Sequence, residues 1–208
     1  GPMLHGHIAF GNGQQAGAAR LGGQQVVERG VERQVVESET AIEKASFRAA
    51  MRHRRILVPT SGFYEWHRPS KESGEKPQAY WIRPRKGGVV CFGGLMETYM
   101  SKDGAELDTG CILTVGANKT VGAIHDRMPV VIEPQNFARW LDCRNGEPRD
   151  IVDLMRPADE DYFEAIPVSD LVNKVANVGA ELQAPATPAP KKQKPASDKS
   201  GDGQMSLF

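Results

Sequence analysis

Between residues 39 and 182 the apolar positions fall into short runs rich in Val, Ile, Phe, Tyr and Trp, with Gly or Pro between the runs. Such runs are typical of β-strands, because branched and aromatic side chains pack well on a pleated sheet. The pattern predicts strands over residues 54–59, 63–67, 79–83, 89–95, 111–115 and 129–132.

Other segments repeat their apolar residues at helical spacing. This pattern predicts short helices over residues 45–51, 118–124, 134–141 and 149–155. Residues 26–36 contain five valines interrupted by charges, which is compatible with a strand or a short helix. Because the strands come in runs rather than alternating with helices, we expect an α+β fold with a mainly antiparallel sheet or open barrel and peripheral helices.

The two ends of the chain have a different composition. Twelve of the fifteen residues from Gly11 to Gln25 are Gly, Gln or Ala, and residues 183–203 contain no large apolar side chain. Such stretches bury too little apolar surface to fold alone. We therefore expect an atypical N-terminal segment (1–38, replaced or disordered), one domain (39–182), a disordered linker (183–203) and a terminal peptide (204–208).

Charge and cysteine content narrow the class of protein. Lys+Arg and Asp+Glu both number 26, so a role with nucleic acid has to rest on a local basic patch. Apolar runs are too short for a membrane span. The 3 cysteines include no C-x-x-C pair, which argues against a disulfide framework or a zinc site. We expect a soluble cytoplasmic protein with no membrane partner.

Glu65 is the first candidate catalytic residue. It lies between Tyr64 and Trp66, three residues after Gly62 of the Ser61-Gly62 pair. In such a partly apolar setting, burial would raise the pKa of the carboxyl and suit it to proton transfer. The alternative is an ordinary strand in which Glu65 points outward between buried aromatic side chains.

His125 is the second candidate catalytic residue, just before a strand-like apolar run. An imidazole exchanges protons near neutral pH, and Asp126 or Arg127 can bias its charge. The alternative is a histidine that caps the end of a helix.

Arginine and tryptophan side chains supply candidate DNA contacts. Arg48 belongs to a group of four arginines within eight residues, and a guanidinium binds phosphate through two parallel hydrogen bonds. A solvated helix face is the alternative. Trp66 is a candidate stacking platform for single-stranded bases, or else part of the core. Cys91 and Cys111 lie in strand-like segments without an obvious cationic neighbour, so we interpret them as structural.

Taken together, these segments resemble the SOS response-associated peptidase (SRAP) family of abasic-site processing proteins. The most specific matches are Gly62-Phe63-Tyr64-Glu65-Trp66 and His125-x-Arg127-Met128-Pro129. Further matches follow in the same order along the chain: Glu39-Thr40, Ser46-Phe47-Arg48, Arg54-Arg55-Ile56-Leu57-Val58-Pro59, Phe92-x-Gly94-Leu95, Ile112-Leu113-Thr114 and Pro167-Val168-Ser169.

The resemblance implies a chemistry. Family members act on single-stranded DNA at an abasic site, where an N-terminal Cys forms a Schiff base and then a thiazolidine, a crosslink that shields the lesion. It implies that Glu65 handles the proton of that amine and that His125 assists sugar-ring opening and crosslink reversal. Thr114 and Arg127 match positions that line the DNA path and hold phosphate. No cofactor is implied, and the protein is expected at the nucleoid.

The sequence departs from the family near its start. Members begin Met-Cys-Gly-Arg, whereas this chain has Met3-Leu4-His5-Gly6, and the family's Asn-Ala-Arg-Ala-Glu-Thr is replaced by Val35-Val36-Glu37-Ser38-Glu39-Thr40. A thiazolidine needs an amine and a thiol on adjacent carbons of one residue. We therefore expect impaired catalysis, with no heat-stable crosslink to abasic DNA.

The last five residues resemble the peptide by which bacterial proteins bind the DNA polymerase sliding clamp. Leu207 and Phe208 would be apolar anchors, and Gln204 would set the register. The alternative is a chance apolar terminus. The function favoured is abasic-site binding in single-stranded DNA near replication forks. The alternatives are a non-catalytic DNA and clamp adaptor, or an autoproteolytic peptidase.

Overall fold

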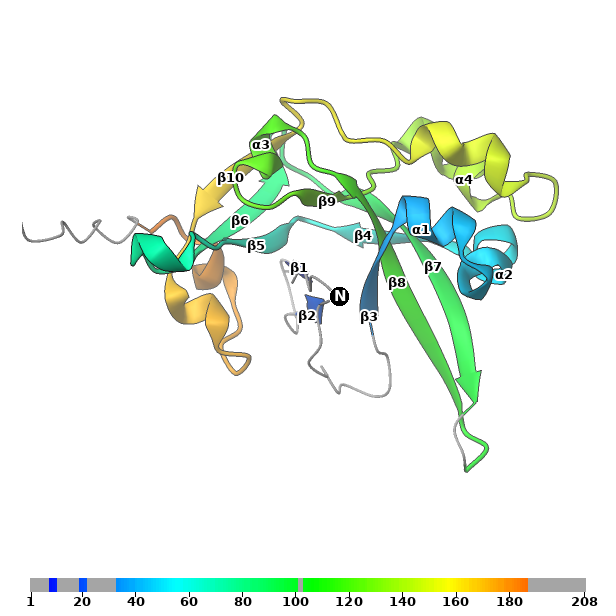
Figure 1. Ribbon diagram of the computed structural model, residues 1–208, viewed down its shortest axis with the longest axis horizontal. Helices are drawn as coiled ribbons and strands as arrows, with labels where there is room; N and C mark the ends of the chain where they lie inside the picture. Colours follow the sequence, from blue (N-terminus) through cyan, green and yellow to red (C-terminus); the bar gives the residue numbers. More distant parts are fainter. Residues whose placement is uncertain (1–7, 11–18, 22–32, 101–102, 187–208) are drawn as a thin grey trace, which may run out of the picture.

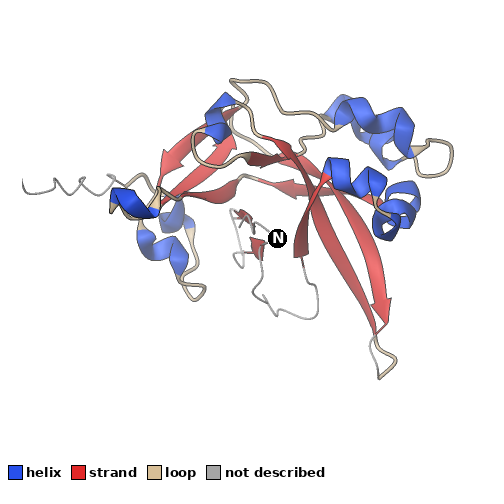
Figure 2. Ribbon diagram, viewed as in Figure 1, coloured by secondary structure: helices blue, strands red, loops and turns tan. Residues whose placement is uncertain are grey.

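The computed structural model describes residues 8–10, 19–21, 33–100 and 103–186, which form two sheets with helices at their edges (Figures 1 and 2). The first sheet has the strand order β10-β6-β5-β1-β2, and all of its pairings are antiparallel. Its strands are β1 (Ile8–Phe10), β2 (Ala19–Leu21), β5 (Phe63–His67), β6 (Gln78–Pro84) and β10 (Phe163–Pro167).

The second sheet has the order β3-β8-β7-β4, and β9 pairs with β8. Only the pairing of β3 with β8 is parallel. Its strands are β3 (Arg33–Glu37), β4 (Arg55–Thr60), β7 (Val90–Met100), β8 (Glu106–Gly116) and β9 (Arg127–Pro129). Within the described residues neither sheet closes into a barrel, so the predicted α+β fold with open, mainly antiparallel sheets is confirmed.

The helices are short and lie at the periphery (Figure 2). The helix predicted over residues 45–51 is present as α2 (Ala45–His53), and the sequence pattern did not predict α1 (Ser38–Glu43) in front of it. The remaining α-helices are α3 (Lys119–Gly122) and α4 (Phe137–Leu141). The 3-10 turns are η1 (Lys71–Ser73), η2 (Pro134–Asn136), η3 (Pro148–Leu154), η4 (Asp170–Asn173) and η5 (Ala180–Gln183).

Three segments differ from the predicted elements. Residues 149–155 form the 3-10 helix η3 rather than an α-helix, with Pro148 at its first turn. Of the strand predicted over 129–132, only Pro129 belongs to a strand, β9, which begins at Arg127, and beyond it Val131 makes an isolated bridge to Phe92. Of residues 26–36, the described part is strand β3. Strand β10 was not predicted.

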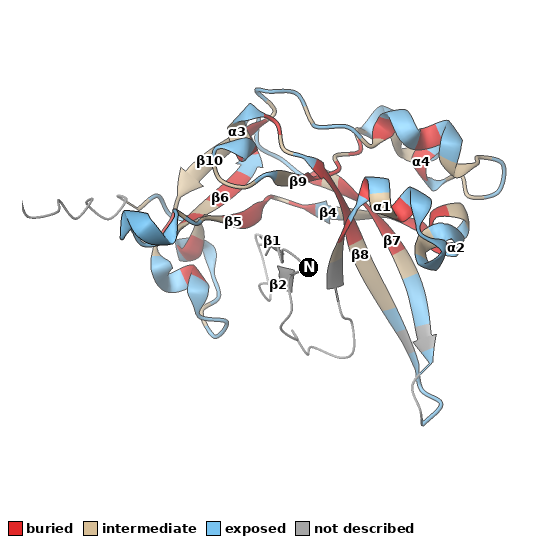
Figure 3. Ribbon diagram, viewed as in Figure 1, coloured by how far each residue is buried: buried red, intermediate tan, exposed pale blue. Residues whose placement is uncertain are grey.

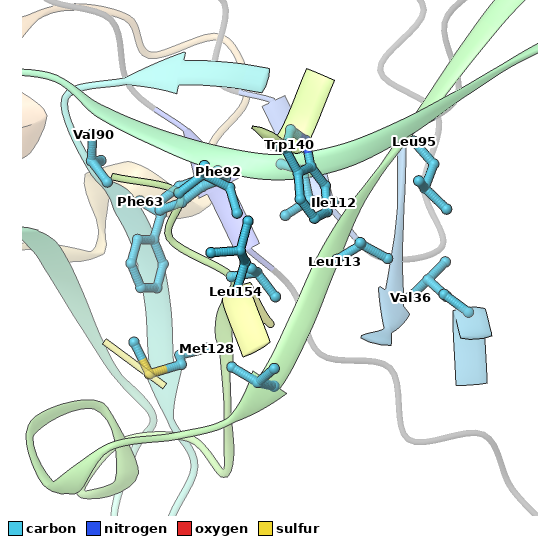
Figure 4. Close-up of a cluster of buried hydrophobic side chains, with 14 of the residues drawn as sticks. Val36, Phe63, Val90, Phe92, Leu95, Ile112, Leu113, Met128, Trp140 and Leu154 are labelled. Carbon is cyan, nitrogen blue, oxygen red and sulfur yellow. The ribbon is translucent and has the colours of Figure 1, made fainter. Parts of the chain in front are cut away.

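One apolar core joins the two sheets (Figure 4). The ring of Phe63 on β5 meets Phe92 on β7 at a centroid distance of 5.8 Å and Phe163 on β10 at 5.7 Å, both edge to face. Such pairs add to the free energy gained by burying the rings. A smaller second cluster surrounds Tyr64 and Trp81 on the other face of the first sheet, and it includes Leu182. The far end of the β7–β8 ribbon is largely exposed (Figure 3).

Gly94 lies where two strands approach each other too closely for a side chain. A Cβ at this position would stand 2.6 Å from the backbone oxygen of Cys111 and 3.2 Å from Ile56. We expect Gly94→Ala to lower the free energy of unfolding by about 2–4 kcal/mol, because the sheet has to shift to admit the methyl group. Urea denaturation measures the loss.

The matched control for this substitution is Gly116→Ala. A Cβ there would meet nothing within 4 Å, so stability should stay close to that of the parent. Equal unfolding midpoints for Gly94→Ala and Gly116→Ala would contradict the close approach.

Candidate functional site

Strand β5 directs Glu65 toward the interior of the protein. Side chains alternate along a strand, so Glu65 shares the face of Phe63, which is the main-core face, while Tyr64 enters the second cluster. All three side chains are buried, and Glu65 is only 2% exposed. The alternative interpretation of Glu65 as an outward-pointing strand residue is therefore wrong, because both faces of β5 are covered at these positions.

The Glu65 carboxyl lacks the partners that would stabilise a negative charge. Its Oε1 accepts a hydrogen bond from the backbone N–H of Trp66 at 3.0 Å, and its buried Oε2 has no hydrogen-bond partner among the described residues. Burial raises the pKa of Glu65 to about 8, against a smaller lowering by the Trp66 N–H. The carboxyl therefore changes its protonation state close to physiological pH.

The segment from Asn118 to Arg127 holds His125 in a defined place. Asn118 caps α3 by accepting the backbone N–H of Val121 at 3.0 Å, and the His125 N–H donates to the Val121 carbonyl at 2.9 Å. The backbone of His125 thus closes the end of α3, as its alternative interpretation proposed. Its ring has a separate role, because Nδ1 accepts the backbone N–H of Arg127 at 3.1 Å.

Arg127 is fixed by groups from two other elements. Its guanidinium donates to both carboxylate oxygens of Glu39 on α1, at 2.8 and 3.4 Å, and to the backbone oxygen of Thr114 on β8 at 2.6 Å. The Arg127 guanidinium holds the pKa of Glu39 below its usual value. Nε of Arg127 is buried without a partner among the described residues. Sequence reasoning did not place Glu39 at the site.

Electrostatics links Glu65 to this turn. The negative charge of Asp126 contributes to the raised pKa of Glu65, whereas Arg68, which follows β5, lowers it. Asp126 lies beside the imidazole of His125, with Oδ1 3.2 Å from Nδ1. The Glu65 carboxyl thus lies within electrostatic reach of Asp126, although 60 residues separate Glu65 from His125 along the chain.

The other candidate DNA contacts are placed differently from one another. Thr114 is 1% exposed, and its hydroxyl donates to the Val36 backbone oxygen on β3 at 3.4 Å. The half-buried Trp66 packs against the second cluster and donates from Nε1 to Oδ1 of Asn173 at 2.9 Å. Contact of either residue with DNA stays a prediction.

The arginine group is largely used within the fold. Arg55 is buried and donates to three backbone oxygens, those of Met51, Trp140 and Asp142. Arg52 pairs with Glu147 at 2.7 Å, and Arg54 donates to Thr98 at 3.0 Å. Of the four, Arg48 is exposed on α2 and is the one that remains a candidate for binding phosphate.

Cys91 and Cys111 have the character of structural residues. Burial raises the pKa of Cys111 to about 11 and also raises that of Cys91, so neither thiol ionises readily. No group of three or more metal-ligating side chains occurs in this part of the chain. Here, too, no helix is long and apolar enough to cross a bilayer. Gln204, Leu207, Phe208 and the segment from Met3 to Gly6 lie outside the described residues.

The fold and the two motifs define a class of protein. The family model for the SOS response associated peptidase (SRAP) matches residues 28–175, and the chain belongs to this family. The match includes every residue of the site described above.

Several curated relatives share the name abasic site processing protein. The chain is 36% identical over 145 residues to YoqW of Bacillus subtilis (strain 168), a match that covers 70% of this chain and 63% of the relative. It is 28% identical over 187 residues to HMCES of Rattus norvegicus, covering 78% and 52% of the two chains. The chain thus spans less than two thirds of the length of these relatives.

Two solved structures share the fold. A protein from Bacteroides thetaiotaomicron matches with a TM-score of 0.65 at 23% identity, over 74% of this chain and 66% of that one. A phage-related protein from Bordetella bronchiseptica matches with a TM-score of 0.51 at 26% identity, over 79% and 78% of the two chains.

Proposed function

We propose that this chain recognises abasic sites in single-stranded DNA, with the lesion sugar lying between Glu65 and His125. The observation that carries the proposal is the buried Glu65 carboxyl, which has one oxygen without a hydrogen-bond partner among the described residues and feels the charge of Asp126, the neighbour of the His125 imidazole. The names of the family's curated relatives supply the substrate class. The burial of the carboxyl supplies the reason for a proton-transfer role.

The proposed roles follow from the chemistry of an abasic site. Its deoxyribose ring opens to an aldehyde when the ring oxygen gains a proton and the C1′ hydroxyl loses one. A carboxyl with a pKa of about 8 carries its proton at neutral pH and releases it with a small change of environment, as acid–base catalysis requires. His125 supplies an imidazole N–H that can hydrogen-bond to an oxygen of the sugar. Arg127 supplies a guanidinium that can bind a neighbouring phosphate.

The crosslinking step is proposed to be impaired in a polypeptide of the printed sequence. Thiazolidine formation needs a cysteine with a free α-amine, and Cys91, Cys111 and Cys143 are internal. We expect abasic single-stranded DNA to bind without forming an adduct that survives heating. A denaturing gel after incubation tests this: a retarded, heat-resistant band would contradict it.

Fluorescence anisotropy with two labelled oligonucleotides tests recognition itself. The strands differ at one position, which is an abasic site in the first and a normal nucleotide in the second. We expect the full chain to bind the abasic strand about ten-fold more tightly. Only that strand presents to Glu65 and His125 a sugar with a C1′ hydroxyl or aldehyde in place of a base.

Two variants relate this preference to the proposed site. Glu65→Gln removes the titratable carboxyl and should reduce the preference, whereas the control Glu72→Gln, on the exposed turn η1, should keep it. Equal affinity of the parent for the two strands would refute the proposed function.

A second proposal concerns a partner. Gln204, Ser206, Leu207 and Phe208 end a polar tail with two apolar residues, a pattern that favours docking into the apolar pocket of a sliding clamp. Such docking would raise the effective concentration of the protein at replication forks. We expect Leu207→Ala with Phe208→Ala to abolish capture of the full chain by immobilised clamp. Lys199→Ala, in the same tail, should not change it, and undiminished capture of the double variant would refute the proposal.

A further inference from the structure

Three groups surround Nδ1 of His125, and all belong to its own turn. The backbone N–H of Arg127 points at Nδ1 from 3.1 Å, the Oδ1 atom of Asp126 lies at 3.2 Å, and the backbone oxygen of Arg127 lies at 3.4 Å. The first of these is a hydrogen-bond donor and the other two are acceptors. The charge on the imidazole decides which of them Nδ1 can engage.

In the neutral ring the Arg127 N–H decides the position of the proton. The Asp126 carbonyl, which precedes this N–H in the chain, accepts the N–H of Ala117 at 2.9 Å, and Arg127 lies opposite Gly116 in the β8–β9 pairing. Among the described residues, the acceptor found for the Arg127 N–H is Nδ1 of His125. Since leaving a half-buried N–H without an acceptor costs free energy, the neutral ring keeps the lone pair on Nδ1 and the proton on Nε2.

In the charged ring both nitrogens carry protons, and Nδ1–H needs an acceptor. Oδ1 of Asp126 is nearer than the Arg127 backbone oxygen and carries a negative charge. The Asp126 side chain is 80% exposed, so it can rotate toward the ring without disturbing the fold. Nε2 makes no hydrogen bond within the described residues and remains available to a ligand in either state.

We propose that the 125–127 turn makes His125 a hydrogen-bond donor through Nε2 in both of its charge states, and that Asp126 is a positioning residue that receives Nδ1–H when the ring is charged. The inference rests on the proposed function for its ligand and deepens it. A fixed donor at Nε2 selects an oxygen lone pair, such as the ring oxygen or the aldehyde oxygen of the lesion sugar.

Other charged groups lie around this imidazole and contribute to its field. Asp126 and Arg68 both act on the Glu65 carboxyl of β5. Arg127 is paired with Glu39 on α1. The charges of Glu39 and Arg127 compensate each other, which leaves Asp126 as the anionic group in direct contact with Nδ1.

Nitrogen-15 NMR of histidine-labelled full-length protein tests the inference without any DNA. His125 is assigned by its loss in His125→Gln, and the exposed His53 at the end of α2 serves as the internal reference for an unconstrained ring. At a pH where both rings are neutral, we expect a larger Nε2–H fraction at His125 than at His53. An equal fraction, or an excess of the Nδ1–H form, would overturn the proposed tautomer.

Asp126→Asn tests the positioning role in the same experiment. Without the carboxylate, Nδ1–H of the charged ring loses its anionic acceptor, so the Nδ1 signal of His125, recorded where the ring is charged, should shift. The control Asp161→Asn, at another exposed aspartate, should leave it unchanged. An unchanged Nδ1 signal in Asp126→Asn would overturn the role of Asp126. If the parent protein shows the expected NMR signals but no preference for the abasic strand, the proposed function is refuted and the tautomer of His125 is not.

Discussion

As the pH rises from about 4.5 to about 8, Glu65→Gln is expected to lose much less stability than the parent protein, because the buried carboxyl that titrates in this range is absent. The carboxyl has a pKa of about 8 in the folded protein, against an ordinary value of 4.5. Below pH 4.5 both the folded and unfolded states hold the proton. Between the two values unfolding releases the proton, so rising pH favours the unfolded state, and above pH 8 the difference stays constant.

The expected size makes this effect easy to detect. At pH 7 the destabilisation due to Glu65 is about 3 kcal/mol, since each pKa unit corresponds to about 1.4 kcal/mol. Urea denaturation of the parent, Glu65→Gln and the exposed control Glu72→Gln across this pH range measures it. Glu65→Gln should give the flatter curve, and Glu72→Gln should follow the parent. Parallel curves for Glu65→Gln and the parent would contradict the raised pKa.

Arg127→Leu is expected to weaken binding of single-stranded abasic DNA about ten-fold and to make that binding less sensitive to salt. A guanidinium that contacts one phosphate displaces counterions, so its loss lowers the slope of log affinity against log salt by about 0.7 for a single strand. Arg127→Lys keeps the charge without the two-pronged geometry and should lie between parent and Arg127→Leu.

Two controls separate phosphate binding from a loss of structure. Arg149→Leu removes an 84% exposed arginine on η3 and should leave the affinity and the salt slope unchanged. Thr98→Ala, which removes a partner of Arg54 on the β7–β8 ribbon, should do the same. If Arg127→Leu binds with the parent's salt slope, Arg127 does not contact phosphate.

Local signals in the sequence were enough to predict many of the strands and helices. The aromatic run 63–67 coincides with β5, and the helix predicted over 45–51 coincides closely with α2. Both segments carry strong intrinsic preferences that tertiary packing did not reverse. The segment 149–155 was misjudged because its helical spacing is shared by a 3-10 turn, and Pro148 starts that turn.

The candidate site was harder to predict from the sequence than the strands and helices. The two titratable candidates were chosen from their sequence neighbours, but the inward direction of Glu65 depends on the face that Phe63 occupies in the core. The contact of Arg127 with Glu39 joins residues that are 88 positions apart, and local spacing carries no signal for it. Likewise, only the folded chain reveals that the guanidinium of Arg55 donates its hydrogen bonds to backbone oxygens.

The most direct test of the central claim is to follow the ring nitrogens of His125 by NMR while the protein is saturated with DNA. Two strands of identical sequence are compared, one with an abasic site and one without. If the lesion sugar lies beside Glu65 and Nε2 of His125, the abasic strand should shift the His125 signals and the intact strand should shift them far less. Identical shifts with both strands, or none with either at saturation, would contradict the account.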